Sequence, residues 1–208
     1  MHNIYKKTVS QELIQAIETI ATLVENKGGK ALVVGGAVRD MLIGKKVKDI
    51  DIEVFGIKPA LLKEVLSTRF KLDLVGLSFG VIKLHHLDID ISMPRRETKR
   101  GIGHKGFDIE SDPDLSVQEA ASRRDFTINA IYYNPIKNEI IDPYNGKMDL
   151  EAKILRHVSE KFVEDPLRVL RGMQFIARFD LAVAPETIEI CKSMTPDNTM
   201  FWLLGDSR

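Results

Sequence analysis

The spacing of apolar residues predicts short strands that alternate with helices in the first half of the chain. Apolar positions from Leu13 to Val24 recur with a helical period, and Ser10 precedes them as a helix cap. Further helices are expected over Val38–Leu42 and from Pro59 through Leu66. Apolar or alternating stretches typical of strands lie at residues 31–34, 49–54, 70–76, 80–86 and 87–92. The last three of these strands follow one another without a helix, so we expect them to pair antiparallel.

The pattern changes after residue 92. Residues 93–116 are polar, basic and rich in glycine and proline, which predicts a long loop. Residues 116–134 then predict a helix, a turn and a strand, and residues 140–156 a hairpin-like edge. Helices are expected from about residue 165 to 178 and from 185 onward. We therefore predict an α/β (α+β) domain over residues 1–150 and an all-helical extension over residues 151–208.

Composition and charge describe an ordinary soluble globular protein. Of 208 residues, 44% are hydrophobic, and 30 basic residues balance 30 acidic ones. Net charge therefore favours no polyanionic partner. The single cysteine, Cys191, has no disulfide partner, and no apolar run approaches the roughly 20 residues of a membrane span. We expect a cytoplasmic protein with no membrane segment.

Candidate chemistry begins with a glycine pair and a row of acids. Gly35 and Gly36 follow the first apolar strand and lead into a helix, an arrangement in which backbone amides bind anions such as phosphate. Asp49, Asp51 and Glu53 occupy alternate positions of the next strand, so their carboxylates share a face. A phosphate at the glycines and divalent cations at the acids would neutralise this row. Taken singly, the glycine turn is more often structural and the acids more often a solvated face.

Three ordered motifs resemble one enzyme family. The segment GGAVRDMLIGKKVKDIDI resembles the signature of the polymerase-β-type nucleotidyltransferase superfamily, in the form found in class II tRNA nucleotidyltransferases (CCA-adding enzymes) and bacterial poly(A) polymerases. The resemblance continues through RRDFTINAIYY (123–133) and EDPLRVLRGMQFIARFDL (164–181). It implies a catalytic head with a mixed, largely antiparallel sheet flanked by helices over residues 1–150, followed by a helical neck over residues 151–208.

The resemblance implies a catalytic site on the acidic strands. Asp49 and Asp51 would bind two Mg²⁺ ions, and Asp90 would be the third catalytic acid, with Asp88 on the same face. Glu53 either shares this site or faces solvent. Family members usually carry glutamate at the position of Asp90. The alternative for Asp88 and Asp90 is that both are simply exposed acids.

The same resemblance places Gly35, Gly36 and Arg39 at the triphosphate of a bound nucleotide. For Arg39 the alternative is a structural ion pair with Asp40 or Asp49.

In the second motif, the resemblance assigns Asp125 to the ribose and Arg124 and Asn129 to the nucleotide pocket. Arginine forks suit phosphates, and a carboxylate accepts a hydrogen bond from a ribose hydroxyl. The alternative is a surface salt bridge, with Thr127 capping a turn.

In the third motif, Asp165 and Arg168 are spaced i, i+3 at the start of a helix, and Arg171 extends the same face. A carboxylate accepts from an exocyclic amine while a guanidinium donates to the adjacent ring nitrogen. Cytosine and adenine present that edge, whereas uracil and guanine do not. The pair therefore predicts selection of CTP and ATP without a template; the alternative is an ordinary surface bridge.

These motifs predict an enzyme that adds CMP, AMP or both from CTP and ATP to the 3′ end of tRNA and releases pyrophosphate. A poly(A) polymerase, a specialised CC- or A-adding enzyme and, from another class, a nucleotide-binding module without turnover stay open. The family normally continues into further helical domains, so we expect a fragment, a truncated product or a minimal form. The apolar segment of Phe201, Trp202, Leu203 and Leu204 suggests packing on the head, on a partner chain or through self-association.

Overall fold

The computed structural model describes residues 2–73, 80–99 and 107–194. It divides into two compact units: unit 1 is Met1–Ala120 with Tyr132–Ile141, and unit 2 is Ala121–Ile131 with Asp142–Arg208. The chain thus leaves unit 1 after residue 120, returns to it for one hairpin and leaves it again. The predicted division at residue 150 into head and neck stays a prediction, and the apolar segment at residues 201–204 lies outside the described residues.

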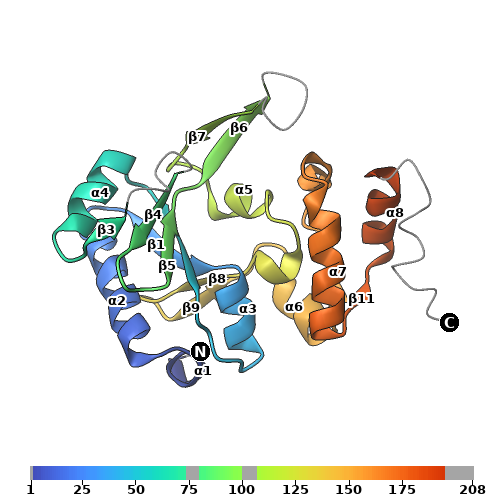
Figure 1. The fold of residues 1–208 in the computed structure, drawn as a ribbon, viewed down its shortest axis with the longest axis horizontal. Coiled ribbons are helices and arrows are strands. Elements are labelled where there is room, and N and C mark those ends of the chain that lie inside the picture. Colours follow the sequence, from blue (N-terminus) through green and yellow to red (C-terminus); the bar gives the residue numbers. More distant parts are fainter. Residues whose placement is uncertain (1, 74–79, 100–106, 195–208) are drawn as a thin grey trace. The chain divides into compact units, whose positions relative to one another are not determined.

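Unit 1 is built on one seven-stranded sheet (Figure 1). In spatial order its strands are β3 (Leu72–Asp73), β4 (Val81–Leu84), β5 (Ile89–Ser92), β2 (Ile50–Phe55), β1 (Lys30–Val34), β8 (Tyr132–Asn134) and β9 (Glu139–Ile141). Only β2 and β5 pair parallel, and the other neighbours are antiparallel. The predicted mixed, largely antiparallel sheet is confirmed.

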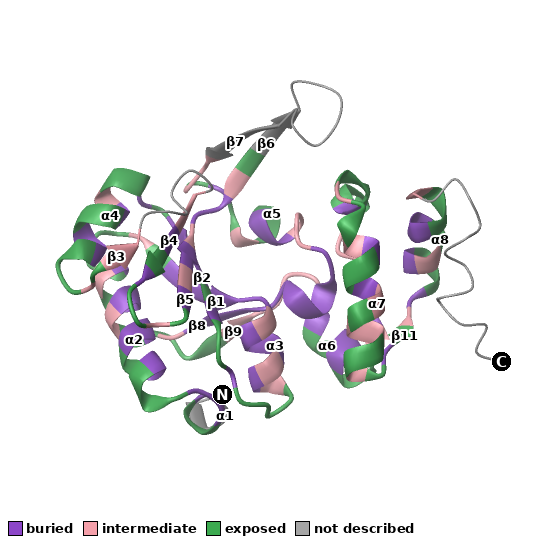
Figure 2. Cartoon of the chain, in the orientation of Figure 1, coloured by how far each residue is buried: buried purple, intermediate pink, exposed green. Residues whose placement is uncertain are grey.

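Helices flank this sheet, and the sequence pattern predicted all of them except α1. They are α1 (His2–Thr8), α2 (Gln11–Glu25), α3 (Gly36–Leu42), α4 (Pro59–Ser67) and α5 (Val117–Ala121), whose last residue begins unit 2. Ser10 caps α2 as expected, because its hydroxyl accepts a hydrogen bond from the Leu13 amide at 3.3 Å. The inner strands β1 and β2 are buried along most of their length (Figure 2). Helix α2 packs on β1, and α3 packs on both strands.

The expected long loop after residue 92 is wrong in part. The strands β6 (Arg95–Lys99) and β7 (Phe107–Ser111) form a separate antiparallel ribbon. The sequence of β6, RRETK, has no alternation of apolar and polar residues, so periodicity does not detect it.

Unit 2 is mainly helical. Its elements are η2 (Thr127–Asn129), α6 (Gly146–Glu151), β10 (Ile154–Leu155), η3 (Glu160–Glu164), α7 (Leu167–Phe179), β11 (Ala182–Val183) and α8 (Pro185–Met194). The hairpin-like edge expected at 140–156 is interrupted by α6, whose first amides, those of Gly146 and Lys147, donate to the Asp142 carboxylate at 2.8 and 2.9 Å.

The expectation of an all-helical extension is corrected in one detail. Strands β10 and β11 pair parallel, so a short sheet accompanies the helices of unit 2. The pairing forms because α7 ends at Asp180 in a left-handed conformation and the chain then runs extended beside β10. Among the described residues, no helix combines the length and the apolar character needed to cross a membrane.

Candidate active site

The predicted catalytic aspartates of unit 1 lie at neighbouring strand positions. Asp51 of β2 is the register partner of Asp90 of β5, so the two carboxylates share a sheet face. Asp51 is exposed, and Asp49 is exposed immediately before β2 begins. On the far side of Asp90, Lys83 of β4 is its antiparallel partner, and Lys83 Nζ lies 2.8 Å from Asp90 Oδ2. The row of acids is therefore interrupted by an ammonium group that the sequence analysis did not consider.

Glu53 does not face solvent, and its carboxylate is hydrogen-bonded within unit 1. It is 9% exposed, and the hydroxyl of Tyr132 donates to its Oε2 at 2.8 Å. The two residues are 79 positions apart in sequence, so local pattern gives no signal for this contact. Glu53 is thus held in unit 1 as a buried, hydrogen-bonded carboxylate.

The donor set partly fits a magnesium ion. Carboxylate oxygens are the ligands that Mg²⁺ prefers, and Asp49 and Asp51 supply them at an exposed position. Within the described ranges, however, no group of three or more His, Cys, Asp or Glu side chains is arranged to hold a metal ion. Asp90 is engaged by Lys83 instead. The residues fit a cation held by two aspartates and completed by other oxygen donors.

The glycine turn before α3 has the geometry that its sequence suggests. Gly35 has φ 75° and ψ −137°, a conformation that side chains with a Cβ rarely adopt. Gly36 needs no such freedom: the nearest atom to a Cβ built there would be Arg39 Nη2, at 3.4 Å. The fold therefore does not require glycine at position 36. The lack of a side chain there leaves room for a ligand close to the turn.

Arg39 makes one of the two ion pairs that the sequence left open. It is 4% exposed, and its Nε and Nη2 lie 2.9 and 2.8 Å from Asp40 Oδ1. Its guanidinium also lies against Gly36. A cation is thus fixed beside the glycine turn.

The second motif folds into a buried carboxylate centre in unit 2. Asp125 is 5% exposed, and its Oδ1 accepts hydrogen bonds from the Phe126 amide at 2.8 Å and from Asn129 Nδ2 at 3.1 Å. Arg171 of α7 pairs with the other oxygen, Oδ2, at 2.7 Å. The structure thus brings three predicted residues together. Arg124 is half-buried just before them, and its amide donates to the Ala121 carbonyl at 3.0 Å.

The alternative for this motif, a surface salt bridge with Thr127 capping a turn, is not what forms. Thr127 is buried, and its hydroxyl donates to Asp149 Oδ2 at 2.7 Å. Arg156 Nε donates to both oxygens of the same carboxylate, at 3.2 and 3.1 Å, and also forms an ion pair with Glu186. A Cβ at Gly146 would overlap the Thr127 carbonyl. Sequence reasoning missed this support of the 125–129 turn, because Asp149 sits in an ordinary amphipathic stretch 22 residues away.

Two side chains of the third motif, Asp165 and Arg168, make hydrogen bonds to the backbone of the protein. Asp165 Oδ1 accepts from the Leu167 amide at 3.0 Å and so caps the start of α7. Arg168 Nη1 donates to the Lys161 carbonyl at 2.8 Å, and Nη2 donates to the Arg123 carbonyl at 2.7 Å. Both residues are half-buried. Arg168 therefore links the beginning of α7 by a hydrogen bond to the segment that carries Asp125.

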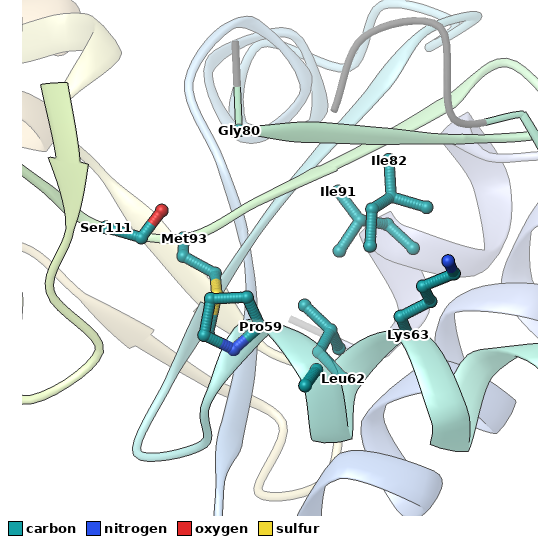
Figure 3. A pocket seen from close by; sticks show the side chains of 9 residues that line it. Pro59, Leu62, Lys63, Gly80, Ile82, Ile91, Met93 and Ser111 are labelled. Carbon is teal, nitrogen blue, oxygen red and sulfur yellow. The ribbon is translucent and has the colours of Figure 1, made fainter. Parts of the chain in front are cut away.

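A cavity of about 320 Å³ in unit 1 lies away from these residues (Figure 3). Leu62 and Lys63 of α4 face Ile82 and Ile91 of the sheet across it. Because successive strand residues point to opposite faces, Ile91 and Asp90 lie on opposite sides of the sheet. This cavity is therefore separate from the aspartate face.

Comparison with known proteins identifies relatives of one kind. The family model described as the poly A polymerase head domain matches residues 31–156. A multifunctional CCA protein of Xylella fastidiosa is 42% identical over 180 residues, which are 85% of this chain and 42% of that protein. One of Chromobacterium violaceum is 43% identical over 165 residues, 79% of this chain and 39% of that protein.

Solved structures agree with this similarity. A CCA-adding enzyme in complex with CTP superposes with a TM-score of 0.74 at 28% identity, covering 92% of this chain and 43% of the other. The Thermotoga maritima CCA-adding enzyme complexed with tRNA superposes with a TM-score of 0.74 at 27% identity, covering 93% and 44%. The chain spans less than half the length of each of these four relatives.

Proposed function

The chain belongs to the poly A polymerase head domain family, and from this premise we propose that it is the nucleotidyltransferase part of a tRNA CCA-adding enzyme. It would transfer CMP, AMP or both from CTP and ATP to the 3′ end of tRNA, releasing pyrophosphate. The observation that carries the proposal is the pair of exposed aspartates, Asp49 and Asp51, that follow the Gly35–Gly36 turn within the matched range.

For the metal, we assign Asp49 and Asp51 as the residues that hold Mg²⁺, with two ions expected. When bound, Mg²⁺ lowers the pKa of an attacking hydroxyl and stabilises charge on a triphosphate. The exposure of both aspartates supports this assignment, because triphosphate and water oxygens can complete the coordination. Asp90 is assigned as the third acid because it is the register partner of Asp51.

For the triphosphate, we assign Gly35, Gly36 and Arg39. The open turn allows a phosphate oxygen to approach the backbone, and the Arg39 guanidinium beside it supplies positive charge. The ion pair with Asp40 orients the Arg39 guanidinium beside the turn.

For the ribose, we assign Asp125, with Arg124 and Asn129 as neighbours in the pocket. An ionised carboxylate has about four lone-pair sites. On Asp125, the Phe126 amide and Asn129 donate to Oδ1, and Arg171 forms an ion pair with Oδ2. Oδ2 accepts no hydrogen bond within the described residues, so it can accept one from a hydroxyl group.

For the base, we assign Asp165 and Arg168, with Arg171 one turn further along α7. Asp165 Oδ2 makes no hydrogen bond within the described part of the chain, so it can accept from the exocyclic amine of cytosine or adenine. Arg168 uses two of its five N–H groups on backbone carbonyls, which leaves donors for the ring nitrogen. Uracil and guanine present a carbonyl and a ring N–H at this edge and would be rejected.

The domain division into a head at 1–150 and a neck at 151–208 is part of this proposal, as is association through the segment 201–204. The relatives named for tRNA and CCA support tRNA as the RNA partner.

The test is sequencing of the products formed from tRNA that lacks its 3′ CCA, incubated with each nucleotide singly and with CTP and ATP together. The proposal predicts ordered addition of C, A or both, and no product with Asp51→Ala. Long A tails on unrelated RNA would identify a poly(A) polymerase instead. Nucleotide binding without any product would identify a binding module.

A further inference from the structure

A lysine lies among the acids of the proposed metal site. Four residues follow one row across neighbouring strands: Asp73 pairs with Lys83, Lys83 with Asp90, and Asp90 with Asp51. Register partners share a face, so the Lys83 ammonium has acids on both sides. It makes its ion pair with Asp90, at 2.8 Å.

The electrostatics of this row agree with the geometry. The pKa of Lys83 is raised, first by its hydrogen bond to Asp90 and further by the charges of Asp90, Asp73 and Asp51. The geometry thus places the positive charge of Lys83 between Asp90 and Asp73. A divalent ion at Asp49 and Asp51 would meet this positive charge near its own position.

We propose that Lys83 is a positioning residue that ties Asp90 away from the divalent cation held by Asp49 and Asp51, and so weakens cation binding by the nucleotide-free chain. This inference rests on the proposed function, because it requires that Asp49 and Asp51 bind the ion. The Lys83 ammonium and the divalent cation compete for the carboxylate of Asp90. The ammonium has the higher local concentration because it is part of the same chain. It also repels the ion.

The arrangement links metal binding to nucleotide binding. A site with two carboxylates and a nearby lysine carries less negative charge than a site with three carboxylates. A triphosphate brings the missing negative charge, and phosphate oxygens are preferred Mg²⁺ ligands. The ion is therefore held firmly only when the nucleotide arrives with it.

The test is titration of the 208-residue chain with Mn²⁺ in the absence of nucleotide, with free Mn²⁺ measured by its electron paramagnetic resonance signal. The variants are Lys83→Met and Lys83→Arg, with Lys58→Met as a matched loss of charge at an exposed lysine before α4. Asp90→Asn is measured alone and in the Lys83→Met background. Asp51→Asn reports whether the proposed metal site exists.

We expect Lys83→Met to tighten Mn²⁺ binding about three- to tenfold, as removal of a nearby exposed charge and release of a carboxylate imply. Lys83→Arg should bind like the wild type, and Lys58→Met should change affinity by less than about twofold because of screening. Asp90→Asn alone should weaken Mn²⁺ binding, but by less than Asp51→Asn does, because it leaves the Lys83 charge unneutralised. In the Lys83→Met background it should remove the gain.

Two results would overturn the inference. Equal affinities of Lys83→Met and wild type would show that Lys83 does not restrain the site. A loss with Asp90→Asn alone as large as with Asp51→Asn would show that Asp90 already binds the ion. Failure of the proposed function looks different, since Asp51→Asn would then leave Mn²⁺ binding unchanged.

Discussion

Substitution of the two glycines before α3 separates a ligand-binding role from a folding role. A Cβ at Gly36 makes only an ordinary contact, 3.4 Å from Arg39 Nη2, so Gly36→Ala should change the free energy of unfolding by less than about 1 kcal/mol. Gly35 has φ 75°, so Gly35→Ala should cost about 1 to 3 kcal/mol. Gly35→Ala should therefore cost more stability than Gly36→Ala.

Nucleotide affinity should fall in the Gly36→Ala protein even though its stability is kept. If the triphosphate approaches the turn, the methyl group of Gly36→Ala blocks a hydrogen bond to a charged group, which is worth about 1.5 to 3 kcal/mol. That loss corresponds to about 10- to 150-fold weaker binding of ATP and CTP. Affinity is measured by calorimetry with Mg²⁺, and stability by urea unfolding of the same samples.

Gly28→Ala is the matched control. Gly28 also has a positive φ, 80°, with open space around it, and it lies before β1 whereas Gly35 lies after that strand. Its variant should lose stability but keep nucleotide affinity. Wild-type affinity of a stable Gly36→Ala protein would refute the assignment of the triphosphate to this turn.

The remaining predictions address the metal, the base, the pH dependence and the RNA. Asp51→Ala should abolish transfer without loss of stability because Asp51 is exposed among like charges; normal turnover in Mg²⁺ would remove Asp51 from the metal site. Asp165→Asn still caps α7 but changes the edge offered to the base, so selection of CTP and ATP over UTP and GTP should weaken by about 1 to 3 kcal/mol in single-turnover assays; unchanged selection would place base reading elsewhere. Burial lowers the pKa of His157 below its usual 6.5, so the unfolded chain binds more protons between the two values. Urea unfolding should therefore show full stability above pH 6.5 and a loss as pH falls through the folded pKa, a slope that His157→Gln should reduce. Binding of tRNA by this chain, measured by filter binding, should be weak and fall steeply with salt; tight, salt-insensitive binding would contradict this.

Local patterns in the sequence predicted most of the sheet and helices because their apolar periods are regular. The Ser10 cap and the strand that carries Asp51 follow from a few adjacent residues. The β6–β7 ribbon and the β10–β11 pair were missed, because each is too short or too polar to show a period. Short pairs of this kind depend on tertiary contacts.

The types of residue that form the site were predictable from the sequence, but the groups that they contact were not. Spacing predicted Asp165 and Arg168 on one helix face, but Asp165 is extended and precedes α7. The carbonyls that Arg168 binds belong to Lys161 and Arg123. The pairing of Lys83 with Asp90 depends on strand register, which the alternating pattern alone does not fix between two strands. The ion pair between Asp125 and Arg171 likewise joins residues 46 positions apart in the chain.

The most direct test of the central claim is calorimetric titration of the chain with CTP, ATP, UTP and GTP, each with and without Mg²⁺. The account predicts Mg²⁺-dependent binding of CTP and ATP, at least about tenfold tighter than UTP and GTP, since one hydrogen bond to a charged group is worth more than about 1.4 kcal/mol. Asp51→Ala should lose the Mg²⁺ dependence. Equal affinity for all four nucleotides, or binding indifferent to Mg²⁺ and to Asp51, would contradict it.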